Sequence, residues 1–288
     1  MLIVTNPAGL RTETRPWRQN DLRIAFVPTM GNLHAGHIRL VERARAMADR
    51  VVVSIFVNPT QFGPNDDFAA YPRTPAEDVA ALTEAGTDLL FMPPVSAMYP
   101  SPEDMTAYVE VPVLSDELCG QFRPGHFRGV TTVVCKLLNM VQPDVALFGE
   151  KDYQQLTLIR RMVSDLNLPV VIHGVATVRE PSGLALSSRN GYLTAAEKTQ
   201  AALLYRLLQE AGHAITSGNR DFSAIEAEKM SALSSAGFQP DYFAIRRASD
   251  LAIPDRQDQH FVVLTAARLG KARLIDNLGI DLTTPLTP

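Results

Sequence analysis

The chain has 288 residues, of which 46% are hydrophobic and 20% are charged, with a formal net charge of −4 and a pI of about 5.9. This balance is that of a globular protein of about two domains and not that of a disordered chain. The negative charge and the absence of a long basic run argue against a nucleic-acid partner, because each neutralised phosphate needs a nearby Lys or Arg.

Short apolar runs alternate with amphipathic stretches through the first 175 or so residues. The predicted strands are Arg23–Val27, Val51–Val57, Asp88–Met92, Val145–Phe148 and Pro169–Val175, and the predicted helices between them are His37–Asp49, Pro75–Ala85, Thr131–Met140 and Tyr153–Leu166. The second strand is apolar on both faces apart from Ser54, which is typical of a parallel sheet covered by helices. The pattern predicts a doubly wound, Rossmann-like α/β sheet that binds ligands beyond the carboxyl ends of its strands.

The pattern changes after residue 176. Two helices are predicted first, and Thr194 and Glu197 form a capping box at the start of the longer one. The predicted elements are helices Thr194–Ser217 and Phe222–Ala236, then strands Asp241–Arg246, His260–Ala266 and Ala272–Asp276. We therefore expect a nucleotide- and substrate-binding domain over residues 1–176 and a smaller α+β lid domain over residues 177–288.

The segment Pro28–His37 follows the first predicted strand and opens the first predicted helix. Gly31 and Gly36 allow a close backbone approach, and a helix N-terminus favours phosphate. His34 and His37 can place two imidazoles beside the same phosphates without carrying a permanent charge. Two histidines at this spacing alone are typical of an ordinary turn, but their position at the first strand–helix turn favours a nucleotide site.

Two further segments carry cations at strand or domain ends. In Phe148–Gln155, Lys151 can neutralise a phosphate, although a plain turn with a solvated lysine is equally compatible. In Leu186–Asn190, two hydroxyls and the Arg189 guanidinium can follow charge as pyrophosphate leaves, and a serine-rich linker is the alternative.

Two more segments offer polar groups for a small substrate. Asn58 and Gln61 are uncharged donors suited to a hydroxy acid, and an Asn-Pro turn is the alternative. The segment Arg123–Gly129 holds two arginines and His126, and is compatible either with a carboxylate contact or with an exposed loop.

Several signals are weak or missing. The two cysteines, Cys119 and Cys135, have no metal-ligand spacing, and no metal site is predicted. Glu77 and Asp78 are expected to be a solvated helix start, and an outer contact to a metal ion is the alternative. No signal peptide and no apolar run long enough to span a bilayer is found, so a cytoplasmic protein without membrane partners is expected.

Six segments together resemble one family in the right order. They are PTMGNLHAGH, SIFVNPTQF, YPRT, RPGHFRGVTTVVCKL, FGEKDYQQL and LALSSRNGYL, with a looser similarity in LTAARLGKARLIDN. The first resembles the HIGH-type signature of nucleotidyltransferase-fold proteins, and the set resembles the pantoate–β-alanine ligases. One departure is Thr60, where that family usually has Met.

The resemblance implies an ATP-dependent ligase that activates pantoate as an acyl-adenylate, joins it to β-alanine and releases AMP and pyrophosphate. It implies ATP with Mg²⁺ as substrate, and a homodimer. His37, His34, Lys151 and Arg189 would be catalytic. The ATP site would comprise Met30, Gly31, Asn32, Leu33, His34, Ala35, Gly36, His37, Gly149, Glu150, Lys151, Asp152, Val178, Leu186, Ser187, Ser188 and Arg189. Gln61, Gln155, Asn58, Arg123 and His126 would bind substrate.

Three other functions are weighed against this one. A nucleotidyltransferase of the same fold would leave the nucleotide on its product. An RNA-binding protein with a synthetase-like fold is disfavoured by the acidic balance. A nicotinamide-binding protein is disfavoured because no G-x-G-x-x-G follows the first strand.

Overall fold

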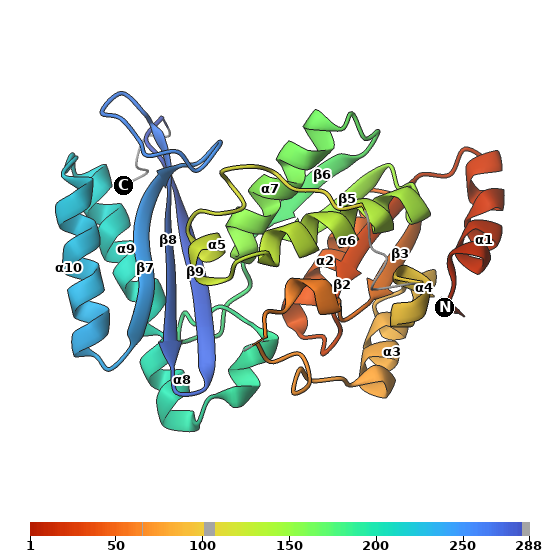
Figure 1. Cartoon of the computed structure of the whole chain (residues 1–288), viewed down its shortest axis with the longest axis horizontal. Helices are drawn as coiled ribbons and strands as arrows, with labels where there is room; N and C mark the ends of the chain where they lie inside the picture. Colours follow the sequence, from red (N-terminus) through yellow and green to blue (C-terminus); the bar gives the residue numbers. More distant parts are fainter. Residues whose placement is uncertain (65, 101–106, 284–288) are drawn as a thin grey trace. The chain divides into compact units, whose positions relative to one another are not determined.

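The structure is a computed structural model that describes residues 1–64, 66–100 and 107–283. The chain forms two compact units, shown in Figure 1. The first comprises Met1–Glu150 and Leu158–Ala176, and the second comprises Lys151–Thr157 and Thr177–Pro288. The short segment Lys151–Thr157 therefore belongs to the second unit, although the chain on both sides of it belongs to the first.

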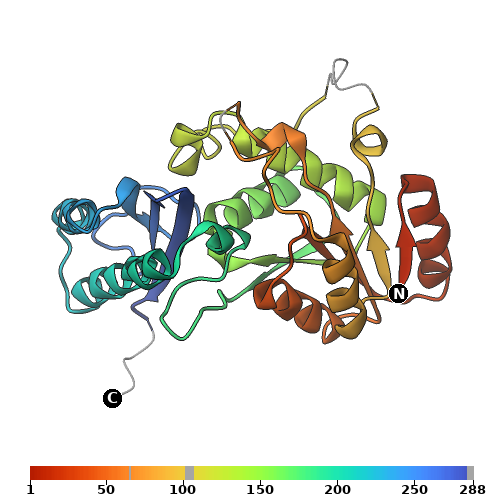
Figure 2. The same cartoon turned by 90° about the horizontal axis from the view of Figure 1, so that it is seen from below.

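The first unit is built on a six-stranded parallel sheet. Its strands are β1 (Leu2–Val4), β2 (Ile24–Thr29), β3 (Arg50–Ile55), β4 (Leu89–Phe91), β5 (Val145–Gly149) and β6 (Val171–Val175). Its helices are α1 (Pro7–Gln19), α2 (Ala35–Arg45), α3 (Pro75–Glu84), α4 (Val95–Met98), α5 (Cys119–Phe122), α6 (His126–Val141) and most of α7 (Tyr153–Asp165). Helices α2 and α3 cover one face of the sheet and α6 the other (Figure 2).

The strand order β1-β4-β3-β2-β5-β6 places the reversal of the winding between β2 and β5. From β2 the chain builds outward through β3 and β4, and then returns to add β5 and β6 on the other side. Such a reversal opens a crevice at the carboxyl ends of the two strands. The segment after Thr29 and the residue Gly149 both lie at this edge, as a doubly wound sheet predicts.

The core of the first unit explains its strands. Val51, Val52 and Val53 of β3 are at most 1% exposed, so both faces of this strand are buried. Leu40, Val41 and Ala44 of α2 pack against the sheet at helical spacing. Together these contacts bury the apolar runs from which the sheet was predicted.

The second unit holds a three-stranded antiparallel sheet in the order β7-β8-β9. Its elements are α8 (Ala195–Ala201), α9 (Leu203–Thr216), α10 (Phe222–Ser235), β7 (Gln239–Arg247), β8 (His260–Leu269) and β9 (Ala272–Asp281). Helices α9 and α10 pack on this sheet over a continuous apolar core. The predicted α/β class with a smaller α+β part is confirmed.

Some predicted boundaries are wrong. Helix α6 begins at His126 rather than Thr131, because Gly125 takes a left-handed conformation (φ 76°) and starts the helix directly after the Pro-Gly pair. The helix predicted over Thr194–Ser217 is interrupted at Ala202 and forms α8 and α9, although its capping box is present. Strand β1 and helix α1 were not predicted, and α1 contains Pro16, which disfavours a helix interior.

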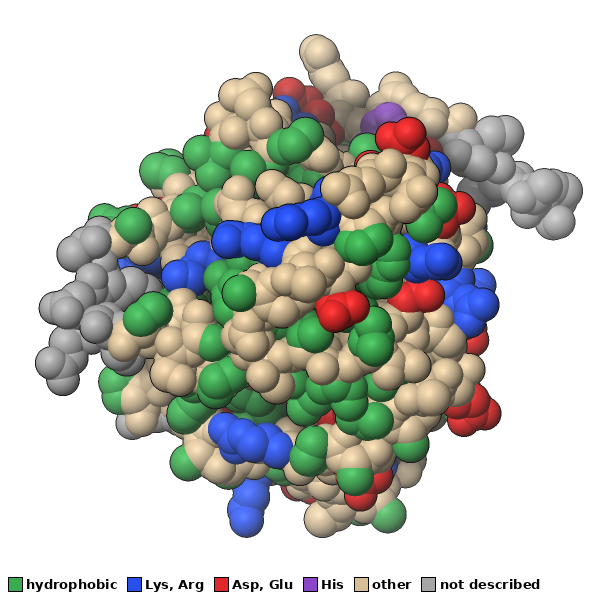
Figure 3. All heavy atoms as spheres, turned by 90° about the vertical axis from the view of Figure 1, so that its right-hand side faces the viewer, with side chains coloured by type: hydrophobic (Ala, Val, Ile, Leu, Met, Phe, Trp, Pro, Cys, Tyr) green, Lys and Arg blue, Asp and Glu red, His purple; other side chains and the backbone are tan. Residues whose placement is uncertain are grey.

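No helix in the described ranges is both long and apolar enough to cross a bilayer. On the face shown in Figure 3, lysine and arginine side chains are interspersed with hydrophobic and acidic ones. That face therefore presents mixed charge.

Candidate active site

The segment after β2 is held by a buried carboxylate. Gly31 (φ 82°) and Asn32 (φ 49°) take left-handed conformations, which turn the backbone N–H groups of residues 32 and 33 inward. Asp78 of α3 accepts both of them, from Asn32 at 2.9 Å and from Leu33 at 2.8 Å. Asp78 is only 3% exposed, so the expectation of a solvated helix start is wrong at this residue. The loop needs an acceptor for its inward donors, and Asp78 supplies it.

The two histidines of this segment cap the start of α2. The His34 Nδ1 accepts the Gly36 N–H at 3.1 Å, and the His37 Nδ1 accepts the His34 N–H at 3.3 Å. Their ring centroids lie 4.1 Å apart. Because Nδ1 is an acceptor in both, the neutral rings carry their proton on Nε2. A Cβ at residue 36 would lie 2.9 Å from the His34 ring, so a larger residue there would displace the imidazole.

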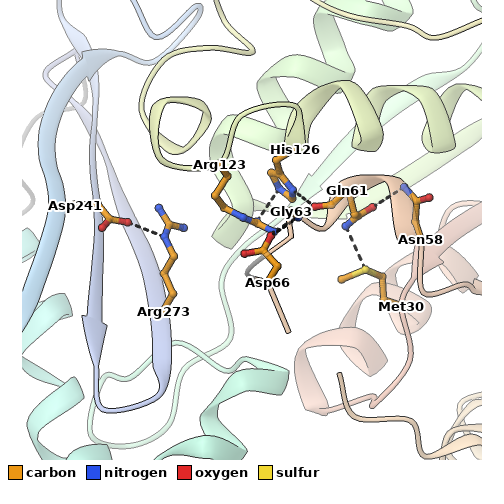
Figure 4. A network of polar contacts seen from close by, with 9 residues as sticks. All are labelled: Met30, Asn58, Gln61, Gly63, Asp66, Arg123, His126, Asp241 and Arg273. Atoms are coloured by element: carbon orange, nitrogen blue, oxygen red, sulfur yellow. Dashed lines mark hydrogen bonds and ion pairs between the residues drawn. The ribbon is translucent and has the colours of Figure 1, made fainter. Parts of the chain in front are cut away.

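Gln61 is oriented by a chain of hydrogen bonds that starts at Tyr99. The Tyr99 hydroxyl donates to the Asn58 Oδ1 at 2.9 Å, and Thr60 donates to the same oxygen at 3.0 Å. This turns the Asn58 amide so that its Nδ2 donates to the Gln61 Oε1 at 3.1 Å. The Gln61 Nε2 is then directed to the Met30 sulfur at 3.2 Å, as Figure 4 shows. A thioether is a weak acceptor, so a substrate oxygen can replace it.

Asn58 itself is 1% exposed and also donates to the Gly129 carbonyl at 3.1 Å. Its amide is thus engaged on both sides inside the protein. Burial raises the pKa of the Tyr99 hydroxyl, which keeps it a neutral donor to Asn58. The arrangement makes Asn58 the residue that orients Gln61.

Helix α6 lies directly on the short helix η1 (Pro59–Gln61). The contact point is Gly129, where an added Cβ would lie 2.4 Å from the Thr60 carbonyl oxygen and 2.8 Å from the Gln61 Cα. No side chain fits in that space without moving the backbone of Gln61. The absence of a Cβ at residue 129 therefore sets the position of Gln61, the residue predicted to bind substrate.

His126 and Arg123 hold the backbone carbonyl of Gln61. The His126 Nδ1 donates to this oxygen at 2.8 Å, and its Nε2 accepts from the Arg123 Nη1 at 3.0 Å. Arg123 also pairs with Asp66 at 2.8 Å. Burial acts to raise the pKa of Asp66, but the hydrogen bonds from Arg123 and the Gly63 N–H outweigh it, and the pKa is lowered.

A pocket of about 230 Å³ adjoins these residues within the first unit. Its lining includes Thr60, Gln61, His126, Arg128 and Thr132. The described residues include no group of three or more His, Cys, Asp or Glu that could hold a metal ion.

The remaining predicted site residues belong to the second unit, except Gly149 and Glu150. An added Cβ at Gly149 meets no atom within 4 Å, so packing gives no reason for glycine there. Lys151 and Asp152 form a short helix with Glu150, and Gln155 follows in the first turn of α7. The contacts of these residues with nucleotide and substrate stay predictions.

Residues 178–186 form a short hairpin that leads into the predicted phosphate loop. The Leu186 N–H donates to the Val178 carbonyl at 2.9 Å. Ser187 caps the helix η4 (Ser188–Tyr192) by accepting the Arg189 N–H at 3.2 Å. The buried Asn190 donates to the Ala185 carbonyl at 3.0 Å, which closes the loop on itself.

Comparison with known proteins identifies the family. The sequence model of the family described as "Pantoate-beta-alanine ligase" matches residues 2–279. The chain belongs to this family. Pantothenate synthetase of Methylococcus capsulatus is 57% identical over 284 residues, which cover 99% of each chain. The solved pantothenate synthetase of Thermus thermophilus has a TM-score of 0.88 at 45% identity, covering 96% of this chain and 99% of that one.

A further solved pantoate–β-alanine ligase, from Francisella tularensis, has a TM-score of 0.81 at 35% identity and covers 99% of this chain and 98% of that one. These matches confirm the predicted ligase class and the resemblance on which it was based. They do not concern individual residues, so the residue roles in this ligase stay predictions.

The structure joins some of the predicted residues and adds others. Met30, Asn58, Gln61, Arg123 and His126 form one network in the first unit (Figure 4). Sequence reasoning missed three residues that shape the site. Asp78 holds the histidine loop, and Tyr99 and Gly129 position Asn58 and Gln61. Each acts across at least 40 residues of chain, and no local pattern marks such a contact.

Proposed function

We propose that this ligase condenses pantoate with β-alanine at the expense of ATP, through a pantoyl-adenylate, and releases AMP and pyrophosphate. The pantoate carboxylate oxygen attacks the α-phosphorus, and the bond from that phosphorus to the pyrophosphate oxygen breaks. The β-alanine amine then attacks the acyl carbon, gives up a proton, and the bond to AMP breaks. Positioning and charge stabilisation carry most of such a reaction.

The histidine pair is the observation that carries the proposal. Both Nδ1 atoms accept backbone N–H groups, so both rings hold their proton on Nε2. Two such donors with centroids 4.1 Å apart suit adjacent phosphate oxygens of one nucleotide. They follow β2 at the reversal of the sheet, where nucleotides bind in doubly wound folds. We assign the contact with the transferred phosphate to His37 and the neighbouring contact to His34.

Gln61 is assigned to pantoate. Its amide NH₂ is aimed at the weak acceptor Met30 and can turn to a carboxylate or hydroxyl oxygen. Asn58, Arg123 and His126 are assigned the task of holding Gln61 rather than touching substrate, since each donates a hydrogen bond to it. Gln155 is assigned a second pantoate contact on the family resemblance alone.

Lys151 and Arg189 of the second unit are also assigned to the nucleotide. We expect Lys151 and Arg189 to neutralise charge on the departing pyrophosphate, as guanidinium and ammonium groups commonly do. The Francisella relative was solved with "Beta-gamma ATP and Beta-alanine", which supports the same two ligands here. Mg²⁺ would arrive bound to the phosphates of ATP, since no protein cage for it is found among the described residues.

The test is a complete reaction followed by mass spectrometry. ATP, Mg²⁺, pantoate and β-alanine should give pantothenate and AMP. Exchange of labelled pyrophosphate into ATP should require pantoate but not β-alanine. Formation of ADP, or an AMP-linked final product, would contradict the proposal.

A matched pair of variants links the reaction to the histidines. His37→Ala should abolish most of the exchange. His213→Ala removes an exposed imidazole from α9 and should leave it unchanged. Equal activity of the two variants would refute the assignment.

Four further properties are proposed from the family resemblance. The ligase is expected to be a cytoplasmic homodimer that binds small molecules only, and its second unit is expected to act as a lid. Sedimentation of the purified chain would test the dimer, and a monomer at micromolar concentration would contradict it.

A further inference from the structure

Strand β9 carries a pair of buried polar residues that the proposed chemistry does not use. Asp276 is 4% exposed and Asn277 is 7% exposed. Buried polar groups are expensive unless they are hydrogen-bonded, so their partners indicate what they hold in place. Their partners lie on two segments of the second unit that are assigned to the nucleotide.

The first segment is the hairpin at residues 178–186. Arg179 forms a two-pronged ion pair with Asp276, with Nη1–Oδ2 at 2.6 Å and Nη2–Oδ1 at 2.9 Å. The same guanidinium donates to the Asn277 carbonyl at 3.2 Å and to the Gly183 carbonyl at 3.1 Å. It also lies 3.6 Å from the ring centroid of Tyr205. Arg179 thereby fixes the hairpin on β9, immediately before Leu186–Arg189.

The second segment is the one that contains Lys151. The Asn277 Nδ2 donates to the Lys151 backbone carbonyl at 2.8 Å. The backbone N–H of Asn277 donates to the Asp276 Oδ1 at 2.8 Å, so the Asp276 carboxylate is also bonded to the main chain at Asn277. Two residues further along, the Tyr153 hydroxyl donates to the Ala248 carbonyl at 2.9 Å. The segment Lys151–Thr157 is thus attached to the second unit by its own hydrogen bonds.

Both segments therefore meet on adjacent residues of one strand. Helix η4, which contains Ser188 and Arg189, also packs against β9. We propose that Asp276 and Asn277 are positioning residues that fix the spacing between Lys151 and Leu186–Arg189, so that both cations are presented to one triphosphate. This rests on the proposed function, because it takes Lys151 and Arg189 as nucleotide contacts.

The test uses three variants of the full chain. Asn277→Ala and Asn277→Asp both remove the donor to the Lys151 carbonyl, and Asp276→Asn weakens the pair with Arg179. Glu226→Gln is the matched control, since Glu226 likewise accepts a backbone N–H, from Ile245 at 2.7 Å, and an arginine, Arg246 at 3.3 Å. It lies in the same unit and bonds to neither segment.

Two readouts are needed. In pantoate-dependent pyrophosphate exchange, the Asn277 variants should lower kcat about 10- to 100-fold and leave the KM for pantoate unchanged. In hydrogen exchange of the ligand-free protein, peptides over residues 150–155 and 185–192 should lose protection, while those over α9 and α10 keep it. Glu226→Gln should change neither segment and should leave kcat as it is.

The outcomes separate this inference from the proposed function. Unchanged protection of both segments in Asn277→Ala overturns the inference, and so does loss of protection throughout the second unit, which would indicate general unfolding. If the wild-type chain shows no pyrophosphate exchange but the two segments alone lose protection, the spacing role stands and the proposed ligase reaction fails. A rise in the KM for pantoate with unchanged kcat also overturns the inference.

Discussion

Replacing Asp78 by Asn tests whether a buried carboxylate shapes the histidine loop. The substitution keeps the size of the side chain but turns one of its oxygens into an NH₂ group. The two oxygens accept the N–H groups of Leu33 and Asn32 at 2.8 and 2.9 Å, so one of these donors loses its acceptor. The side chain is 3% exposed, and water cannot easily replace the lost partner.

The magnitude follows from the cost of a buried unpaired donor, which is about 1–3 kcal/mol. The turn also holds Asn32 in a left-handed conformation (φ 49°), which costs a non-glycine residue about 1–2 kcal/mol and persists only while its partners hold it. We therefore expect Asp78→Asn to lower the free energy of unfolding by about 1–3 kcal/mol. Relaxation of the loop should lower kcat/KM for ATP about 10- to 100-fold, because His34 and His37 follow it in the chain.

The assays are guanidinium unfolding and pantoate-dependent pyrophosphate exchange. Glu84→Gln is the control, since Glu84 is an exposed residue of the same helix. Removing its charge should change neither the free energy of unfolding nor the kcat/KM for ATP. The reasoning is refuted if Asp78→Asn has the stability and the kcat/KM for ATP of the wild type. It is also refuted if the KM for pantoate changes while that for ATP does not.

Three further predictions concern the rest of the site. Gly129→Ala should displace η1, raise the KM for pantoate and lower the free energy of unfolding by about 1–3 kcal/mol. Gly279→Ala is the control: its added Cβ meets no atom within 4 Å, so the KM for pantoate and the free energy of unfolding should stay those of the wild type. The pKa of Asp66 is lowered in the folded state, so its ion pair stabilises the protein above the ordinary carboxyl pKa and this contribution is lost as pH falls through the lowered pKa. The difference in unfolding free energy between wild type and Asp66→Asn should therefore shrink below about pH 4, and a difference independent of pH would contradict this. Tyr99→Phe removes the hydroxyl that orients Asn58, and should raise the KM for pantoate and leave that for ATP unchanged in steady-state kinetics; a changed KM for ATP alone would count against it.

Much of the fold follows from local patterns. Strand β3 is apolar on both faces, and such strands occur where helices cover a parallel sheet on both sides. The capping box of Thr194 and Glu197 marks the start of α8 within one turn. The interruption at Ala202 has no such mark in the sequence, because alanine is a good helix former.

The site was predictable only in part, because contacts between residues far apart in the chain leave no local sequence pattern. The Gly- and His-containing segment Pro28–His37 is recognisable from sequence, because its residue types are those needed where the backbone contacts phosphate. Asp78 could not be assigned, since acidic residues in the first turn of a helix are usually solvated and favoured by the helix dipole. Its burial depends on a loop 45 residues earlier in the chain. The role of Asn277 likewise appears only once β9 lies against the Lys151 segment.

The adenylate is the central claim, and oxygen tracing tests it most directly. With pantoate labelled by ¹⁸O in both carboxylate oxygens, attack on the α-phosphorus should leave one labelled oxygen in the released AMP and one in the amide of the product. Mass spectrometry of the two products reads this outcome. Label in pyrophosphate or inorganic phosphate, with unlabelled AMP, would show attack on another phosphorus and contradict the account.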